Sequence, residues 1–156
     1  MVGDCSAANA FESADIDLSF MARPVMVMML VAVLCSLFLA VTFIQSSLNK
    51  LSDYKGNKLY FASVFEKTFL KNAAGILLPV ITAMEFLSGF GLLAGIVCTF
   101  CCRDTRLLIG GLVLGALSFI CLLAGQRIAK DYAGAASLTT YFLIAVVGLV
   151  ACAFIF

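Results

Sequence analysis

The sequence predicts an all-α integral membrane protein, an antiparallel four-helix bundle, and three observations lead to this fold class. The chain is 63% hydrophobic and only 12% charged, whereas soluble domains carry about 25% charged residues. Its mean hydropathy is +1.13. The apolar residues form four long runs, each near or above the ~20 residues that a helix needs to cross a hydrocarbon core of roughly 30 Å. These runs cover about residues 25–44, 73–100, 107–125 and 138–156.

Residues 1–23 form a polar segment that precedes the membrane domain of residues 24–156. Acidic residues stand where a signal peptide has a basic region, so we do not expect a cleaved signal. Proline is favourable in the first turn of a helix, where the backbone N–H groups have no partner. We therefore expect the first membrane helix to begin at Pro24, just after Arg23.

The first connection, residues 45–72, is long, and the other two, residues 101–106 and about 126–136, are short. Short connections make neighbouring helices antiparallel. Within the long connection, the stretch LYFASVFEKTFL (residues 59–70) places apolar side chains near helical spacing. This pattern predicts a short amphipathic helix lying in the membrane interface; an ordinary linker folded onto the bundle fits the same residues.

Small residues at a spacing of four indicate where helices approach closely. Gly91 and Gly95 have this spacing in the second run, and Gly111 and Gly115 have it in the third. In lipid such pairs let two helix backbones come close together. We expect these glycines to have a structural role.

Basic residues are divided unequally between the two ends of the bundle. The first and third connections hold seven of them, against three at the opposite end. The positive-inside rule then places the long connection in the cytoplasm and both termini outside. The seven are Lys50, Lys55, Lys58, Lys67, Lys71, Arg127 and Lys130, and the three are Arg23, Arg103 and Arg106.

Glu85 is the only acid within the four apolar runs. An isolated charge inside a membrane costs several kcal/mol, so this residue needs a partner, a proton or a function. Polar residues gather at the ends of the first and third runs, on one side of the membrane. They are Gln45, Asn49 and Lys50 in the first group, and Gln126, Arg127 and Asp131 in the second, where Arg127 and Asp131 have the spacing of an i,i+4 pair.

Three interpretations of Glu85 remain open at this point. It pairs with Lys50 or Arg127, or stays protonated and hydrogen-bonds within the bundle. Alternatively, with the surrounding polar cluster, it forms a site for a proton-coupled head group such as a quinone. An ion pathway is the third interpretation, although transport usually shows more than one acid in the spans.

The cysteines offer a different chemistry at the end of the second run, in the stretch CTFCC. Cysteines in a C-x-x-C spacing can form a redox disulfide, and the basic-residue count places this end outside, where disulfides persist. Membrane-edge cysteines or a lipidation site are the alternative for Cys98, Cys101 and Cys102. We expect no metal site, because the chain has no His and no fourth ligand is evident. The mid-run cysteines Cys35, Cys121 and Cys152 are expected to fill the interior.

Three stretches together resemble the DoxX family of small four-helix bacterial membrane proteins. They are QSSLNKLSD, VITAMEFLSGFGLLAGI and GQRIAKDYAGAASLTTYFLIAVVGLV. The family pattern has an Arg opening the first helix, a Lys-Leu pair closing it and a Glu within the second, which Arg23, Lys50–Leu51 and Glu85 match. The family often has a Gly shortly before the Lys-Leu pair, where this chain has residues 46–49, Ser-Ser-Leu-Asn.

The resemblance implies a protein of the bacterial cytoplasmic (inner) membrane, linked to thiosulfate:quinone oxidoreduction or to membrane complexes that handle oxidative and sulfur stress. The sequence has no redox cofactor motif of its own, so electron transfer would need a quinone or a partner's centre. We favour an accessory or structural subunit of a larger membrane complex over a quinone-linked redox subunit, because of this and because the Gly is missing. Lipid and other membrane subunits are the expected partners, and no nucleic acid. A ring-sized cavity lined by Glu85 with Lys50 or Arg127 would favour the quinone alternative.

Overall fold

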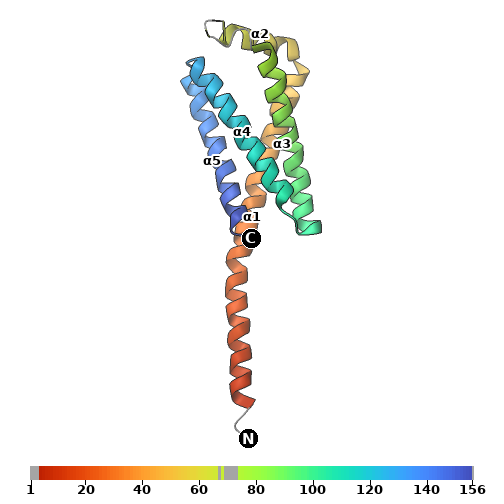
Figure 1. Ribbon diagram of the computed structural model, residues 1–156, viewed down its shortest axis with the longest axis vertical. Coiled ribbons are helices and arrows are strands. Elements are labelled where there is room, and N and C mark those ends of the chain that lie inside the picture. Colours follow the sequence, from red (N-terminus) through yellow and green to blue (C-terminus); the bar gives the residue numbers. More distant parts are fainter. Residues whose placement is uncertain (1–3, 67, 69–73, 156) are drawn as a thin grey trace.

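The computed structural model describes residues 4–66, 68 and 74–155, and this part of the chain is helical apart from short turns. Four long helices and one short helix follow one another (Figure 1). They are α1 Asp4–Ser52, α2 Tyr54–Val64, α3 Ala74–Cys102, α4 Arg106–Ile128 and α5 Tyr132–Ala153.

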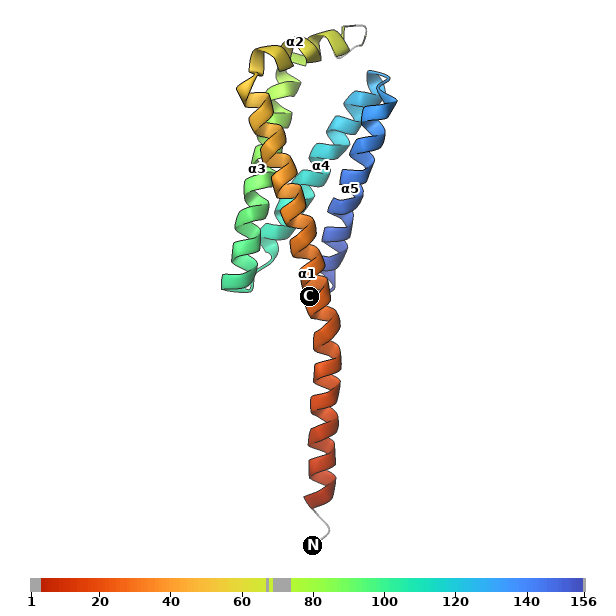
Figure 2. The same ribbon diagram turned by 180° about the vertical axis from the view of Figure 1, so that it is seen from behind.

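The four long helices confirm the predicted all-α membrane bundle. Within the described residues, each contains a segment long and apolar enough to cross a membrane: Arg23–Ser52, Gly75–Cys102, Arg106–Ile128 and Tyr132–Ala153. Around the bundle, α1 packs against α3, α3 against α4, α4 against α5, and α5 against α1. Helices α3 and α4 approach each other near the turn that joins them and diverge toward α2 (Figures 1 and 2).

Helix α1 begins 20 residues earlier than the expected start at Pro24, because its first residue is Asp4. The segment from Asp4 to Arg23 contains no Gly or Pro, so nothing in it breaks a helix. Pro24 therefore lies inside α1, where it supplies no N–H to the preceding turn. The N-terminal part of α1 runs beyond the ends of the other helices (Figure 1).

The short helix of the long connection also begins earlier than expected. Asp53 caps α2 by accepting a hydrogen bond from the backbone N–H of Gly56 at 3.0 Å, and an acid at this position satisfies an N–H that has no helical partner. The helix ends at Val64, and Phe65, which follows it, is buried. Residues 67, 69 and 70 of the expected amphipathic stretch lie outside the described residues.

The glycines of α3 and α4 hold these two helices in close contact. A side chain at Gly95 would meet the Leu108 Cα at 2.6 Å, and one at Gly111 would meet the Leu92 backbone N at 3.1 Å. Beside them, the Ser88 hydroxyl donates a hydrogen bond to the Gly111 carbonyl at 2.9 Å. The sequence-based expectation of close backbone approach at these glycines is confirmed.

Tight turns join α3 to α4 and α4 to α5. In each turn an acid accepts a hydrogen bond from a backbone N–H at the start of the helix that follows. Asp104 accepts a hydrogen bond from the Arg106 backbone N–H at 2.9 Å, and Asp131 accepts one from the Gly134 N–H at 3.0 Å. The Asp131 carboxylate is therefore committed to the start of α5, which matters for the polar cluster described next.

Candidate functional site

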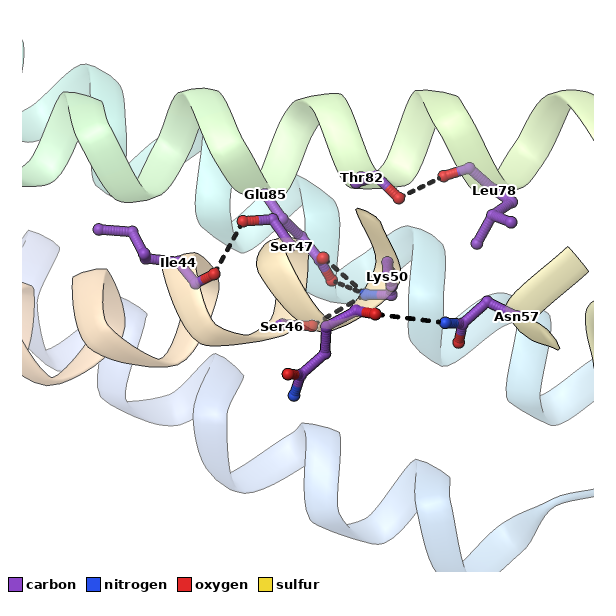
Figure 3. A network of polar contacts seen from close by, with 9 residues as sticks. Ile44, Ser46, Ser47, Lys50, Asn57, Leu78, Thr82 and Glu85 are labelled. Carbon is purple, nitrogen blue, oxygen red and sulfur yellow. Dashed lines mark hydrogen bonds and ion pairs between the residues drawn. The ribbon is translucent and has the colours of Figure 1, made fainter. Parts of the chain in front are cut away.

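An ion pair between α1 and α3 forms the polar centre of the bundle (Figure 3). The Lys50 ammonium lies 2.7 Å from Glu85 Oε1 and 2.6 Å from Glu85 Oε2. It also donates to the Ser46 hydroxyl at 2.9 Å. Ser46 and Lys50 are four residues apart on α1 and share one face, and Glu85 faces them from α3.

This ion pair is largely removed from the surroundings. The Glu85 side chain is 2% exposed and the Lys50 side chain 14%. A lysine ammonium has three N–H donors, and its three contacts are with the two Glu85 oxygens and Ser46. The pair therefore brings both charges into the bundle as a neutral unit, which lowers the cost of a carboxylate in a membrane span.

A cavity of about 350 Å³ lies beside the ion pair and is lined by residues from all five helices. Lys50, Glu85 and Ser46 contribute polar atoms to its wall, and aromatic and aliphatic side chains form most of the remainder. Its lining residues include those of α2 and of the parts of α3 and α4 toward α2, where these two helices diverge (Figure 2). It is partly open to the surroundings.

Stacked aromatic rings from three helices form one side of this region. Phe43 and Phe119 stack at 4.7 Å between ring centroids, and Phe119 stacks on Tyr141 at 5.9 Å. Phe38 extends the series, 6.1 Å from Tyr141. Phe43, Phe119 and Tyr141 line the cavity, so aromatic side chains lie in the same region as the ion pair. Aromatic faces of this kind favour stacking with a planar ring.

Gln126 lines the same cavity and carries a buried side-chain oxygen without a partner among the described residues. Its Oε1 is buried and has no hydrogen-bond partner within the described part of the chain, and the residue lines the cavity near the end of α4. Nearly all buried polar atoms in proteins are paired. The Gln126 Oε1 is therefore an exception to this rule.

The sequence-predicted site residues separate into two groups. The first group lines the cavity and consists of Lys50, Glu85, Gln126 and Asp131. The second group is exposed and does not line it; its members are Gln45, Asn49 and Arg127.

The expected i,i+4 pair between Arg127 and Asp131 is not formed. The Arg127 guanidinium lies over the Tyr132 ring, 5.7 Å from its centroid, and Asp131 caps α5. The physical reason is that α4 ends at Ile128, so the two residues do not share a helix and the spacing argument does not apply to them.

Several cavity residues were not predicted from the sequence. The aromatic side chains have no feature that separates them from ordinary bundle core. Ser46 had a usable signal, because it precedes Lys50 by one helical turn and so shares its face. The residues not predicted include Ser46, Phe43, Phe119, Tyr141, Tyr60 and Phe61.

The candidate thiols lie at the opposite end of α3 from α2. Cys98 is half-buried and Cys101 and Cys102 are exposed, and all three are free. Cys121, expected to fill the interior, is instead exposed and lines the cavity, because the helices diverge at its level. Cys152 is buried, as expected for a small apolar side chain.

The fold and the site define a multi-pass membrane protein whose helical bundle holds a buried Lys–Glu pair beside a cavity. The DoxX family model matches residues 34–125, which include both charges of the pair and more than half of the chain. The chain therefore belongs to the DoxX family, which confirms the resemblance found in its sequence. No curated protein and no solved structure matches it.

Proposed function

We propose that this protein binds the ring of a membrane-soluble quinone in the cavity beside Lys50 and Glu85. In this proposal it acts as a subunit of a larger membrane complex in the bacterial cytoplasmic membrane. The observation that carries the proposal is the cavity itself, about 350 Å³ in volume and lined by both members of the ion pair.

The residues present fit such a ligand. Pockets that bind small molecules have volumes of about 300–1,000 Å³, mostly apolar walls and a few polar groups that fix orientation. Here Phe43, Phe119 and Tyr141 supply aromatic side chains, and the polar groups of the wall include Glu85 and Gln126. The surrounding helices are apolar, which suits a ligand that arrives through the membrane.

Each group would have a distinct role toward the bound ring. The aromatic side chains pack against the ring, the Ser46 hydroxyl and the Gln126 amide N–H groups can donate hydrogen bonds to its oxygens, and Glu85 lies where a proton would be exchanged with them. A quinone supplies two-electron chemistry coupled to proton uptake. Because the sequence has no cofactor motif of its own, a partner subunit supplies the electrons or accepts them, which supports the placement in a complex.

The scaffold hypothesis favoured from the sequence depends on a bundle core without a ring-sized space. A rigid Lys–Glu contact serves a scaffold as well as a binding site, so the ion pair does not separate the two hypotheses. The cavity is the observation that supports the quinone alternative. Ser46 is one of the four residues that stand where the family often has a Gly. Its side chain is small and lies on the cavity wall, so the lack of a Gly does not fill the cavity.

A cavity-filling substitution with a matched control tests the proposal. Leu138 lines the cavity from α5, whereas Leu143 on the same helix is 61% exposed. Purified protein in detergent is titrated calorimetrically with duroquinone, whose fully methylated ring leaves no position for addition of the Cys121 thiol. We expect wild type and Leu143→Trp to bind and Leu138→Trp to show no binding. Absence of binding to wild type, or equal binding to both variants, would contradict the proposal.

A further inference from the structure

We infer that the outward face of α2 binds the head groups of anionic phospholipids, with Lys55 and Lys58 as the contacts. This surface and the cavity-lining residues lie on different faces of α2, so the inference goes beyond the proposed function and does not depend on it. The partner is defined by its chemistry, a negatively charged phosphate-bearing head group attached to apolar chains.

Helix α2 lies at the level where the membrane spans end. It begins at Tyr54, two residues after the end of the span Arg23–Ser52, and the next span begins at Gly75. It crosses the end of the bundle (Figure 1). Tyrosine is enriched at membrane interfaces, where its ring meets lipid and its hydroxyl meets water. Three of the four tyrosines are exposed at this end of the bundle, namely Tyr54, Tyr60 and Tyr132, which indicates that α2 lies in the interface.

The two faces of α2 differ in their surroundings. Phe61 and Val64 line the cavity, and their spacing of three places them on one face. Lys55, Lys58 and Leu59 have spacings of three and four on another face, and all three are exposed, Leu59 to 72%. A leucine beside two lysines suits the boundary between acyl chains and head groups, because lysine holds its ammonium group at the polar level while its stem lies along apolar surface.

This outward face requires a partner for two reasons. Isolated helices shorter than about 12–15 residues are marginal in water, and none of the 11 described residues of α2 is buried. In addition, Lys55 and Lys58 form no ion pair within the described part of the chain. The nearby acid Asp53 instead accepts the Gly56 N–H at the start of the helix. Anions from the surroundings are therefore needed to balance two ammonium groups on one short face.

A phospholipid fits this face better than a protein partner does. A helix of 11 residues is about 17 Å long, whereas a stable protein interface buries about 800 Å² on each partner, which is more than one face of α2 offers. Head groups are already present at this level. Each lysine near an anionic membrane surface strengthens the attraction by about 5-fold.

Lipid bound to this face has a structural consequence for the bundle. Any ligand that binds only the folded state stabilises it, so anionic lipid should raise the midpoint of thermal unfolding. Because α2 also supplies Phe61 and Val64 to the cavity wall, the same lipid holds that wall in place.

The test measures lipid binding to the purified full-length protein in detergent by native mass spectrometry. Dioleoylphosphatidylglycerol is compared with dioleoylphosphatidylcholine, which has the same acyl chains and a neutral head group. We expect wild type to bind the phosphatidylglycerol more tightly. In the double variant Lys55→Gln, Lys58→Gln, the affinity for the first bound phosphatidylglycerol should fall by about 30-fold, or about 5-fold for each lysine.

The control is the double variant Arg103→Gln, Arg106→Gln, which removes two exposed charges at the opposite end of the bundle and should keep the wild-type affinity. Inorganic phosphate should not compete, because it lacks the apolar chains that lie beside Leu59. Equal binding of the two lipids by wild type, equal losses in the two double variants, or full competition by phosphate would overturn the inference. So would the loss of a co-purifying acidic protein, rather than of lipid, from Lys55→Gln, Lys58→Gln.

These outcomes are independent of the proposed function, because none of them involves duroquinone. Failure of the cavity to bind a ring leaves the lipid inference intact, and equal binding of the two lipids leaves ring binding intact. The wild-type comparison of the two lipids tests the inference even if the lysine variant does not fold.

Discussion

The Lys50 ammonium contacts both carboxylate oxygens of Glu85, at 2.7 and 2.6 Å, so the last turn of α1 is joined to the middle of α3. These residues are 35 positions apart in the chain. Their contact therefore joins the end of α1 to α3, and α2 lies between these two helices in the chain. It also fixes the polar wall of the cavity.

Removing one member of this pair should destabilise the protein strongly. In Glu85→Gln or Lys50→Met, the remaining charge stays buried without its partner, which typically costs about 3–5 kcal/mol. We expect a lower midpoint of thermal unfolding in detergent and lower expression for each single variant.

The double variant Lys50→Met, Glu85→Leu is the control for these single changes. Replacing a whole buried pair by apolar residues is often neutral or stabilising. The double variant should therefore be more stable than either single variant. Wild-type stability in Glu85→Gln would contradict a structural role of the ion pair and indicate that the bundle tolerates a neutral side chain there.

The contact between α3 and α4 should be sensitive to a single methyl group at Gly95. A Cβ at this position meets the Leu108 backbone at 2.6 and 2.7 Å, so the two helices must move apart, and overpacking typically costs about 1–3 kcal/mol. Gly95→Ala should lower the thermal unfolding midpoint. Gly110→Ala is the matched control, because nothing lies within 4 Å of its Cβ, and equal midpoints for the two variants would argue against this contact.

The hydrogen bond between Ser88 and the Gly111 carbonyl should make a smaller contribution. Hydrogen bonds between membrane helices contribute on average about 0.6 kcal/mol and at most about 1.7 kcal/mol. Ser88→Ala should lower stability by an amount in this range, measured by denaturation of the purified protein. Thr99→Ala is the comparison, since its hydroxyl bonds to Gly95 of its own helix at 2.8 Å and its loss should have less effect on helix association. A larger loss in Thr99→Ala would contradict this assignment.

The orientation in the membrane can be tested with the thiols. The basic-residue count predicts that the end of α3 lies outside the cytoplasm and that α2 lies inside. A variant retaining only Cys102, which is exposed, should react with a membrane-impermeant maleimide in intact cells. A cysteine-free variant carrying Leu59→Cys, at a site that is 72% exposed on α2, should react only after lysis. The reverse pattern would invert the proposed topology.

The bundle could be predicted from sequence because uninterrupted apolar length is a local property. Each predicted run overlaps one long helix, and the glycine spacings indicated the α3–α4 contact. The predicted start of α1 at Pro24 was wrong, because proline in the first turn of a helix and proline inside a longer helix have similar sequence surroundings. The deciding feature was the helix-compatible segment that precedes Pro24.

The candidate site was only partly predictable. The cost of an isolated charge indicated a cation as one of the partners open to Glu85, and both Lys50 and Arg127 were expected on the correct side of the membrane. Which one reaches Glu85 depends on the rotation of each helix about its axis, as does the direction of Gln126. The cavity could not be predicted at all, because the divergence of α3 and α4 is a property of the packed helices together.

The close contact at Gly95 holds α3 and α4 together at one end, and the two helices diverge from it toward the cavity at the other end. Leu108, at the contact with Gly95, and Cys121, at the cavity, are 13 residues apart on α4, or about 20 Å along the helix. Over this lever arm, a small change of crossing angle at the contact becomes a larger change in cavity width. The width of the cavity is therefore set in part by residues, Gly95 and Leu108, that do not line it.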